Sequence, residues 1–111
     1  MSNIFLDNDY NVIVKGSNEF GILGFPGEVE SIDNETKLPI KAKELIKTKK
    51  FTIIVDFKDN VYFTGEYYTE ISKKHQFGFK RFEPYLEISD LKYTCRIIGK
   101  FKGIEILLER E

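Results

Sequence analysis

The most constraining feature of the chain is a pair of apolar segments joined by a short polar turn. Between residues 51 and 57, apolar side chains occupy every second position. This period of two is that of a β-strand with one face against a core. Residues 58–60 (Lys-Asp-Asn) are typical of a turn, and 61–71 returns as a second strand. The sequence therefore predicts an antiparallel hairpin, with a bulge or bend at Gly65.

Apolar segments on either side of this hairpin predict further strands. Residues 4–6 suit an edge strand or an anchored tail, and 10–15 a strand that is buried on both faces or at its centre. Toward the C-terminus, 85–89 and 91–98 alternate apolar and polar residues, and 104–108 closes a second hairpin after a loop. Short connections favour antiparallel neighbours.

One segment, residues 39–50, has a helical pattern instead. Pro39 suits a first helical turn, where its missing N–H costs nothing. Ile40, Leu45 and Ile46 could share an apolar face with Ala42 alongside, and the lysines at 47–50 suit a helix C-terminus. We therefore predict a mainly β (α+β) fold. It is a small antiparallel sheet or a partly open barrel with one short helix, a single domain over 1–111, and no internal repeat.

Composition narrows the classes of function. The 41% of hydrophobic residues suffices for a core, and a net charge of -1 creates no global field that attracts nucleic acid or an anionic membrane. No apolar run approaches the ~20 residues of a membrane span, and the N-terminus lacks the basic start of a signal peptide. We expect a cytoplasmic protein with no membrane partner. Its Lys, Ile, Asn and Phe bias is associated with AT-rich bacterial genomes.

A glycine-rich stretch over residues 16–27 has two interpretations. It could cradle a phosphate, although it fits neither the dinucleotide nor the P-loop pattern. Alternatively, its glycines mark a bent strand with turns at 16–18 and 26–27. The second interpretation is favoured because glycine usually serves backbone geometry.

Residues suited to catalysis are scarce. The chain has one histidine, His75, and one cysteine, Cys95, and the latter is expected on the apolar face of a strand. Two such residues do not make a zinc site. The sequence therefore predicts no enzyme, no catalytic or metal-binding residues and no cofactor. An enzyme that uses His75 is a third hypothesis, which predicts a pH profile near the histidine pKa.

An acidic segment over residues 28–36 carries the leading functional hypothesis. Its carboxylates face no basic residue within the segment, and they could meet the basic surface of a nuclease. The hypothesis is a non-enzymatic protein-binding module, in its concrete form an inhibitor or immunity-type protein that blocks the active site of a toxin or nuclease. The predicted contact residues are Glu28, Glu30, Asp33 and Glu35.

A basic and aromatic segment over residues 73–85 carries the alternative. Lysine and arginine contact phosphates and aromatic rings stack on bases, which would suit a nucleic-acid or ribonucleoprotein accessory. The competing interpretation is a half-buried strand with Phe77 and Phe79 in the core. The candidate anion surface comprises Lys73, Lys74, His75, Lys80, Arg81 and Phe82.

The same segment resembles a motif in the third β-barrel domain of elongation factor Tu, a barrel shared by small bacterial stand-alone proteins. The residues near matching places are His75, Phe79, Lys80, Phe82 and Pro84. The twin glycines, the compact Tyr-Arg-Pro and the downstream Pro-Gly-Asp turn of that family are absent here. The resemblance implies a small antiparallel barrel. It implies no GTPase activity, because that belongs to a different domain.

Overall fold

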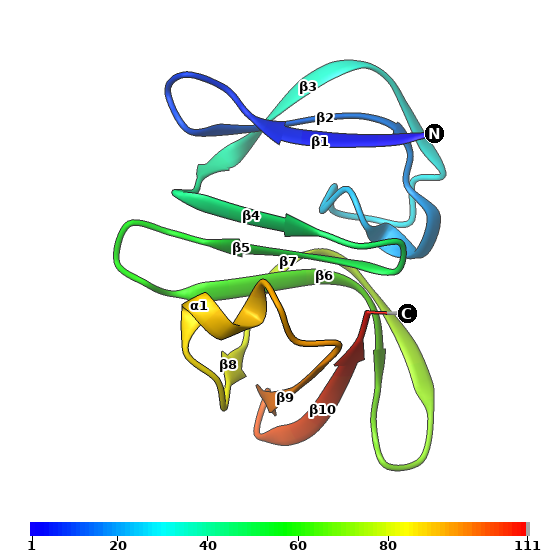
Figure 1. Cartoon of the computed structure of the whole chain (residues 1–111). Coiled ribbons are helices and arrows are strands. Elements are labelled where there is room, and N and C mark those ends of the chain that lie inside the picture. Colours follow the sequence, from blue (N-terminus) through cyan, green and yellow to red (C-terminus); the bar gives the residue numbers. More distant parts are fainter. Residues whose placement is uncertain (111) are drawn as a thin grey trace.

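The computed structural model describes residues 1–110 and consists of two antiparallel sheets (Figure 1). Helical structure in these residues is limited to a 3-10 turn, η1 (Glu19–Gly21), and one short helix, α1 (Ile88–Leu91). The prediction of a mainly β, antiparallel fold is confirmed. Sheet A contains β1 (Ser2–Leu6), β2 (Asn11–Ser17) and β3 (Ser31–Lys41). Sheet B contains β4 (Glu44–Lys47), β5 (Phe51–Val55), β6 (Val61–Tyr68), β7 (Lys73–Arg81), β8 (Glu83–Pro84), β9 (Arg96–Phe101) and β10 (Ile104–Glu109).

Sheet B curls into a half-barrel. Its strand order is β4-β5-β6-β10-β9-β8, with β7 paired to β6. β6 and β10 pair only through Tyr68 and Leu107, and beyond this point β8, β9 and β10 turn steeply away from β4 and β5 (Figure 1). Leu91 of α1 packs into the core enclosed by this curl. The predicted hairpins β5–β6 and β9–β10 are both confirmed.

β5 separates two hydrophobic cores, which is why all five of its residues are buried. Phe51, Ile53 and Val55 face the core inside the half-barrel. Ile54 points to the other side and packs with residues of sheet A. The alternation of the sequence thus assigns the two faces correctly, although both faces are covered rather than one.

The hairpins β1–β2 and β5–β6 have the same pairing register and the same type of turn, a structural repeat that was not predicted from the sequence. Position n in residues 2–17 corresponds to n + 49 in residues 51–66. For example, Ser2 pairs with Gly16 as Phe51 pairs with Gly65, and Leu6 with Val12 as Val55 with Val61. The identical pairs are Ile4/Ile53, Asp7/Asp56, Asn11/Asn60, Val12/Val61 and Gly16/Gly65.

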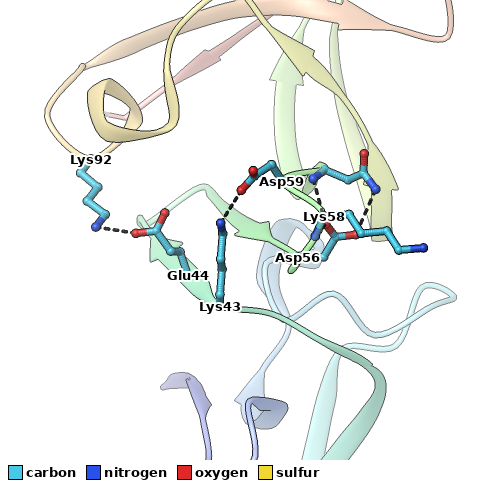
Figure 2. A network of polar contacts seen from close by, with 7 residues as sticks. Lys43, Glu44, Asp56, Lys58, Asp59 and Lys92 are labelled. Atoms are coloured by element: carbon cyan, nitrogen blue, oxygen red, sulfur yellow. Dashed lines mark hydrogen bonds and ion pairs between the residues drawn. The ribbon is translucent and has the colours of Figure 1, made fainter.

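The two turns of these hairpins share the hydrogen bonds between their aspartate and asparagine. In the first, Asp7 Oδ1 accepts from the Asn11 N–H at 2.8 Å, and the Asn11 side-chain amide donates to Asp7 Oδ2. Asp56 and Asn60 repeat both contacts, as Figure 2 shows around Asp56. In each copy the residue before the asparagine, at positions 10 and 59, is left-handed, with φ of 65° and 66°. The two turns therefore share the sequence motif Asp-x-x-x-Asn.

The third strands, β3 and β7, also pair with their middle strands in a similar way. Val14 and Gly16 pair with Thr36 and Ile32, and the corresponding Phe63 and Gly65 pair with Lys80 and Gln76. Between these pairs, one residue of the middle strand thus faces three of the third strand in both copies, which is a bulge over residues 33–35 or 77–79. We call β1–β3 the N-terminal unit and β5–β7 the central unit. The sequence predicted a bulge or bend at Gly65. The extra residues of that bulge lie in β7, the strand that pairs with Gly65.

The predicted helix over 39–50 is wrong. Residues up to Lys41 belong to β3, and Glu44–Lys47 forms β4. Pro39 lies where β3 bulges against β2, at a position that needs no ladder N–H. Ala42 and Ile46 are buried in different cores rather than on one helical face. Tertiary pairing with β5 therefore overrides the local helical pattern.

The strands predicted over 85–89 and 91–98 are also wrong in large part. α1 occupies 88–91, and β9 begins only at Arg96. Ile88 and Leu91 are three residues apart, a spacing at which one helical turn brings both to the core. Cys95 is exposed, whereas the sequence predicted it on an apolar strand face.

Ion pairs on the surface connect the turn of β5–β6 and α1 to the start of β4 (Figure 2). Lys43 pairs with Asp59, and Lys92 Nζ lies 2.6 Å from Glu44 Oε1. The pairs lie on the exterior and join neighbouring elements. They are therefore assigned to packing rather than to a functional site.

Candidate functional site

The connection between β2 and β3, residues 18–30, is held rigidly by buried polar groups. The Asn18 side chain donates to the Val29 carbonyl oxygen and accepts from the Leu23 N–H, both at 2.9 Å. From the neighbouring unit, the Thr52 hydroxyl donates to the Ile22 carbonyl oxygen at 2.7 Å, and Thr64 donates to Gly21 at 2.6 Å. We call residues 18–30 the connecting loop. Its glycines shape the backbone, although β2 runs through Gly16 to Ser17, so the turn predicted at 16–18 is wrong.

A groove of about 600 Å³ opens along this loop. Three carboxylates, those of Glu19, Glu28 and Glu30, line it. Among residues 1–110 none of the three lies within 4.0 Å of a cationic nitrogen. The remaining lining residues are Ser17, Asn18, Phe20, Val29 and Phe77, and we call the whole the acidic groove.

Phe20 gives this groove an unusual wall. It is an aromatic residue with φ of 63°, a left-handed conformation that costs energy for a bulky side chain. Its ring lies against that of His75, with centroids 5.2 Å apart. The strained backbone is therefore held by packing against β7, and the wall of the groove is fixed before any partner arrives.

The structure divides the predicted acidic patch. Glu28 and Glu30 line the groove, whereas Asp33 and Glu35 lie in the bulge of β3 and do not. Sequence reasoning missed the three other main contributors, Glu19, Phe20 and Phe77. Glu19 and Phe20 lie within the stretch that was interpreted through its glycines alone.

The predicted basic and aromatic surface is not one patch. Lys73, Lys74 and His75 lie at one end of β7, and Lys80 and Arg81 lie at the other, so the two groups pair with opposite ends of β6. The half-buried interpretation fits this strand, because Phe77 and Phe79 are both partly buried. Phe82 is only 1% exposed and packs against Phe63, so its proposed role in stacking on a base is wrong.

One end of β7 contributes instead to a separate basic recess. Arg81 lines it together with Lys100, Lys102 and Gly103 of the β9–β10 hairpin, and with Glu83. The recess measures about 580 Å³. Three cations and one carboxylate leave it with an excess of positive charge. This grouping was missed because Lys100 and Lys102 are distant in sequence from Arg81.

The other end of β7 meets a buried carboxylate, Glu66, which is 3% exposed. The Tyr68 hydroxyl donates to Glu66 Oε2 at 2.9 Å, His75 Nε2 lies 3.1 Å from Oε1, and Lys50 Nζ lies 3.7 Å from Oε2. Burial of the Glu66 carboxylate opposes its charged form and by itself would raise its pKa. The bonds from Tyr68 and His75 and the charges of Lys73 and Lys50 nevertheless hold the Glu66 pKa below its usual value.

These contacts favour a structural role for His75. Its ring is engaged by Glu66 and Phe20, and it lines neither the acidic groove nor the basic recess. No hydrogen bond between its ring and the Cys95 thiol occurs in the described part of the chain. Within residues 1–110, no group of three or more His, Cys, Asp or Glu side chains could hold a metal ion.

Comparisons with family models, with curated proteins and with solved structures gave no match for this chain. The resemblance to the third domain of elongation factor Tu stays a prediction. No helix within residues 1–110 has the length and apolar character needed to cross a membrane.

Proposed function

We propose that the chain is a non-enzymatic protein-binding module whose acidic groove receives a basic surface of another protein. The observation that carries the proposal is a preformed groove with three carboxylates that lack a cationic partner in the described chain. Rigid walls reduce the entropy lost on binding. Uncompensated carboxylates favour a partner of opposite charge and accelerate its approach.

The concrete form of the proposal is an inhibitor or immunity-type protein. A toxin or nuclease that acts on nucleic acid has a positively charged active-site surface, which is complementary to Glu19, Glu28 and Glu30. The exposed Val29 between the glutamates adds an apolar contact within the same groove. Blocking such a surface requires shape and charge but no catalytic group on the inhibitor.

The test is capture of partners from a lysate of the source organism, with and without nuclease treatment. We expect a basic protein that survives the treatment and whose association rate falls steeply with salt. Reversing Glu28 and Glu30 to lysine should slow association at least tenfold at low salt. Unchanged association of that variant would contradict the proposal.

A second candidate, nucleic-acid binding, is favoured by the basic recess around Arg81, Lys100 and Lys102. It differs from the original alternative, because Lys73 and Lys74 are at the far end of β7. It predicts that a single-stranded oligonucleotide binds with a steep salt dependence and that Lys100→Glu abolishes binding. Binding that is insensitive to this substitution would eliminate the recess as the site.

A further inference from the structure

An apolar recess of about 290 Å³ lies beside the acidic groove. Eight of its nine lining residues have no polar side chain, and the exception is Lys80. Its volume is at the lower end of ligand sites in proteins, which suits one aromatic or branched aliphatic side chain rather than a large cofactor. The apolar lining residues are Gly24, Pro26, Leu38, Pro39, Ile40, Phe77, Gly78 and Phe79.

Three separate pieces of chain build this recess at the junction of the two units. Leu38–Ile40 come from the second bulge of β3, and Phe77–Phe79 form the bulge of β7. Gly24 and Pro26 belong to the connecting loop, and a Cβ on Gly24 would lie only 2.2 Å from the Phe79 ring. The close fit shows that these walls are packed against each other. Bulges commonly redirect side chains beside binding sites.

The recess and the acidic groove are adjacent, and Phe77 lines both. Their electrostatic character differs. The groove side has three carboxylates, whereas the recess has a single exposed cation, Lys80, which forms no ion pair among residues 1–110. A bound segment with both cations and an apolar side chain is therefore oriented, because its cations are attracted to one side of Phe77 and repelled from the other.

We infer that the occupant of this face is a basic segment of a partner protein that places cationic side chains in the acidic groove and an adjacent apolar side chain in the recess. This inference rests on the proposed function, since it names the second contact that the same partner makes. The cations provide attraction and the apolar side chain provides the specific anchor.

The test is an NMR titration of the full chain with capped peptides, followed through backbone amide shifts. The probes are Arg-Arg-Gly-Gly-Phe, the same peptide with glycine in place of phenylalanine, and the same peptide with glutamates in place of arginines. We expect the first to shift amides in both 28–30 and 78–80, and the second to shift those in 28–30 but not those in 78–80. Phe77 is left out because it lines both sites. Loss of the phenylalanine should weaken binding about threefold to tenfold.

Two matched variants distinguish a cation placed at the recess from a change in the net charge of the chain. Pro39→Lys adds a cation at the recess, and Ile71→Lys adds the same charge at the tip of the β6–β7 hairpin, where Ile71 is 91% exposed. We expect Pro39→Lys to abolish the advantage of the phenylalanine peptide and Ile71→Lys to preserve it. Dispersed amide spectra of the free variants confirm that both fold.

The outcomes distinguish the inference from the proposed function. Equal binding of both arginine peptides, with shifts in 28–30 and none in 78–80, overturns the recess and leaves the acidic groove standing. Equal shifts at 78–80 from the arginine and glutamate peptides, with none at 28–30, overturn the proposed function and the predicted orientation. Absence of shifts from every peptide at millimolar concentration overturns both.

Discussion

The N-terminal and central units share three paired strands and a turn, but they differ in the connection that leads to the third strand. In the central unit β6 reaches β7 through residues 69–72, whereas in the N-terminal unit β2 reaches β3 through the much longer connecting loop over 18–30. Most residues of the acidic groove come from that loop, whereas the loop contributes only Gly24 and Pro26 to the apolar recess. The comparison teaches that the acidic groove is an addition to a repeated framework, whereas the apolar recess also uses the bulged strands of that framework.

The bulges of β3 and β7 also differ between the two units, in the exposure of their side chains. Asp33, Asn34 and Glu35 in β3 are all exposed, whereas Phe77, Gly78 and Phe79 in β7 are half-buried or buried against the connecting loop. The same backbone device thus presents charge in one unit and provides a docking surface in the other. The Thr64 hydroxyl accepts from the Gly78 N–H, which stabilises the second bulge from within the core.

The largest expected effect comes from the corresponding glycines. A Cβ at Gly65 would lie 2.4 Å from the Lys50 carbonyl oxygen, and one at Gly16 would lie 1.9 Å from that of Met1. Both have positive φ, but Met1 is at the chain end and can move aside. We expect Gly65→Ala to lower the free energy of unfolding by about 3 kcal/mol and Gly16→Ala by about 1 kcal/mol. Urea titration checks the order, and a larger loss for Gly16→Ala would contradict the comparison.

A second contrast concerns Glu66 and the corresponding Ser17. Glu66 is buried among Tyr68, His75 and Lys50, whereas Ser17 contributes its backbone carbonyl oxygen to Ser2. We expect Glu66→Leu to cost about 2 kcal/mol, since it removes the contacts of a buried carboxylate with Tyr68, His75 and Lys50, and Ser17→Ala to cost less than about 0.5 kcal/mol. Equal losses in urea titrations would mean that the buried carboxylate is not a special feature of the central unit.

The pH dependence provides a third test. Hydrogen bonds from Asn11 lower the pKa of Asp7. The pKa of Asp56 is also lowered, because the bonds from Asn60 and Lys58 outweigh its desolvation. With Glu66, these groups stabilise the fold fully above their unfolded values, 3.8 for aspartate and 4.5 for glutamate, and less as pH falls through the lower folded values.

The urea midpoint should therefore fall between pH 6 and pH 3. Asp7→Asn and Asp56→Asn should each flatten that fall, because the bonds from the asparagine recur in both turns. The effect of Asp56→Asn should be slightly larger, because the Tyr62 hydroxyl also donates to Asp56. A flattening in only one variant would show that the turns, although alike in geometry, differ in energy.

The smallest effects are expected at the ion pairs of Figure 2, which have no counterpart in the repeat. Lys43 and Lys92 are on the surface, where such pairs contribute little. Replacing either with methionine should leave the urea midpoint unchanged within error. A shift as large as that of Glu66→Leu would show that these pairs hold the framework together.

The sequence predicted the parts that depend on local pattern. Alternation identified β5 and β6, and the closing hairpin at 104–108 was found in the same way. The repeat was missed because only scattered positions such as Asp7/Asp56 are shared, and their turn role is evident only when both hydrogen-bond sets are seen. The helix over 39–50 failed because pairing with β5 outweighs propensity.

The candidate site was harder to predict because it is tertiary. Glu28 and Glu30 were identified from charge alone, but the wall formed by Phe77 depends on the packing of β7 against the connecting loop. Phe82 was misplaced because local sequence cannot show whether an aromatic ring points to solvent or to a core. Residues 28–35 also appeared continuous, although a bulge removes Asp33 and Glu35 from the groove.

The most direct test of the account compares two double charge reversals in binding to the captured partner. Glu28→Lys with Glu30→Lys alters the acidic groove, and Asp33→Lys with Glu35→Lys changes net charge equally on the β3 bulge. At physiological salt we predict at least a tenfold loss of affinity for the first pair and less than a twofold loss for the second. Equal losses would show that total charge alone matters, and no loss in the first pair would contradict a binding face on the connecting loop.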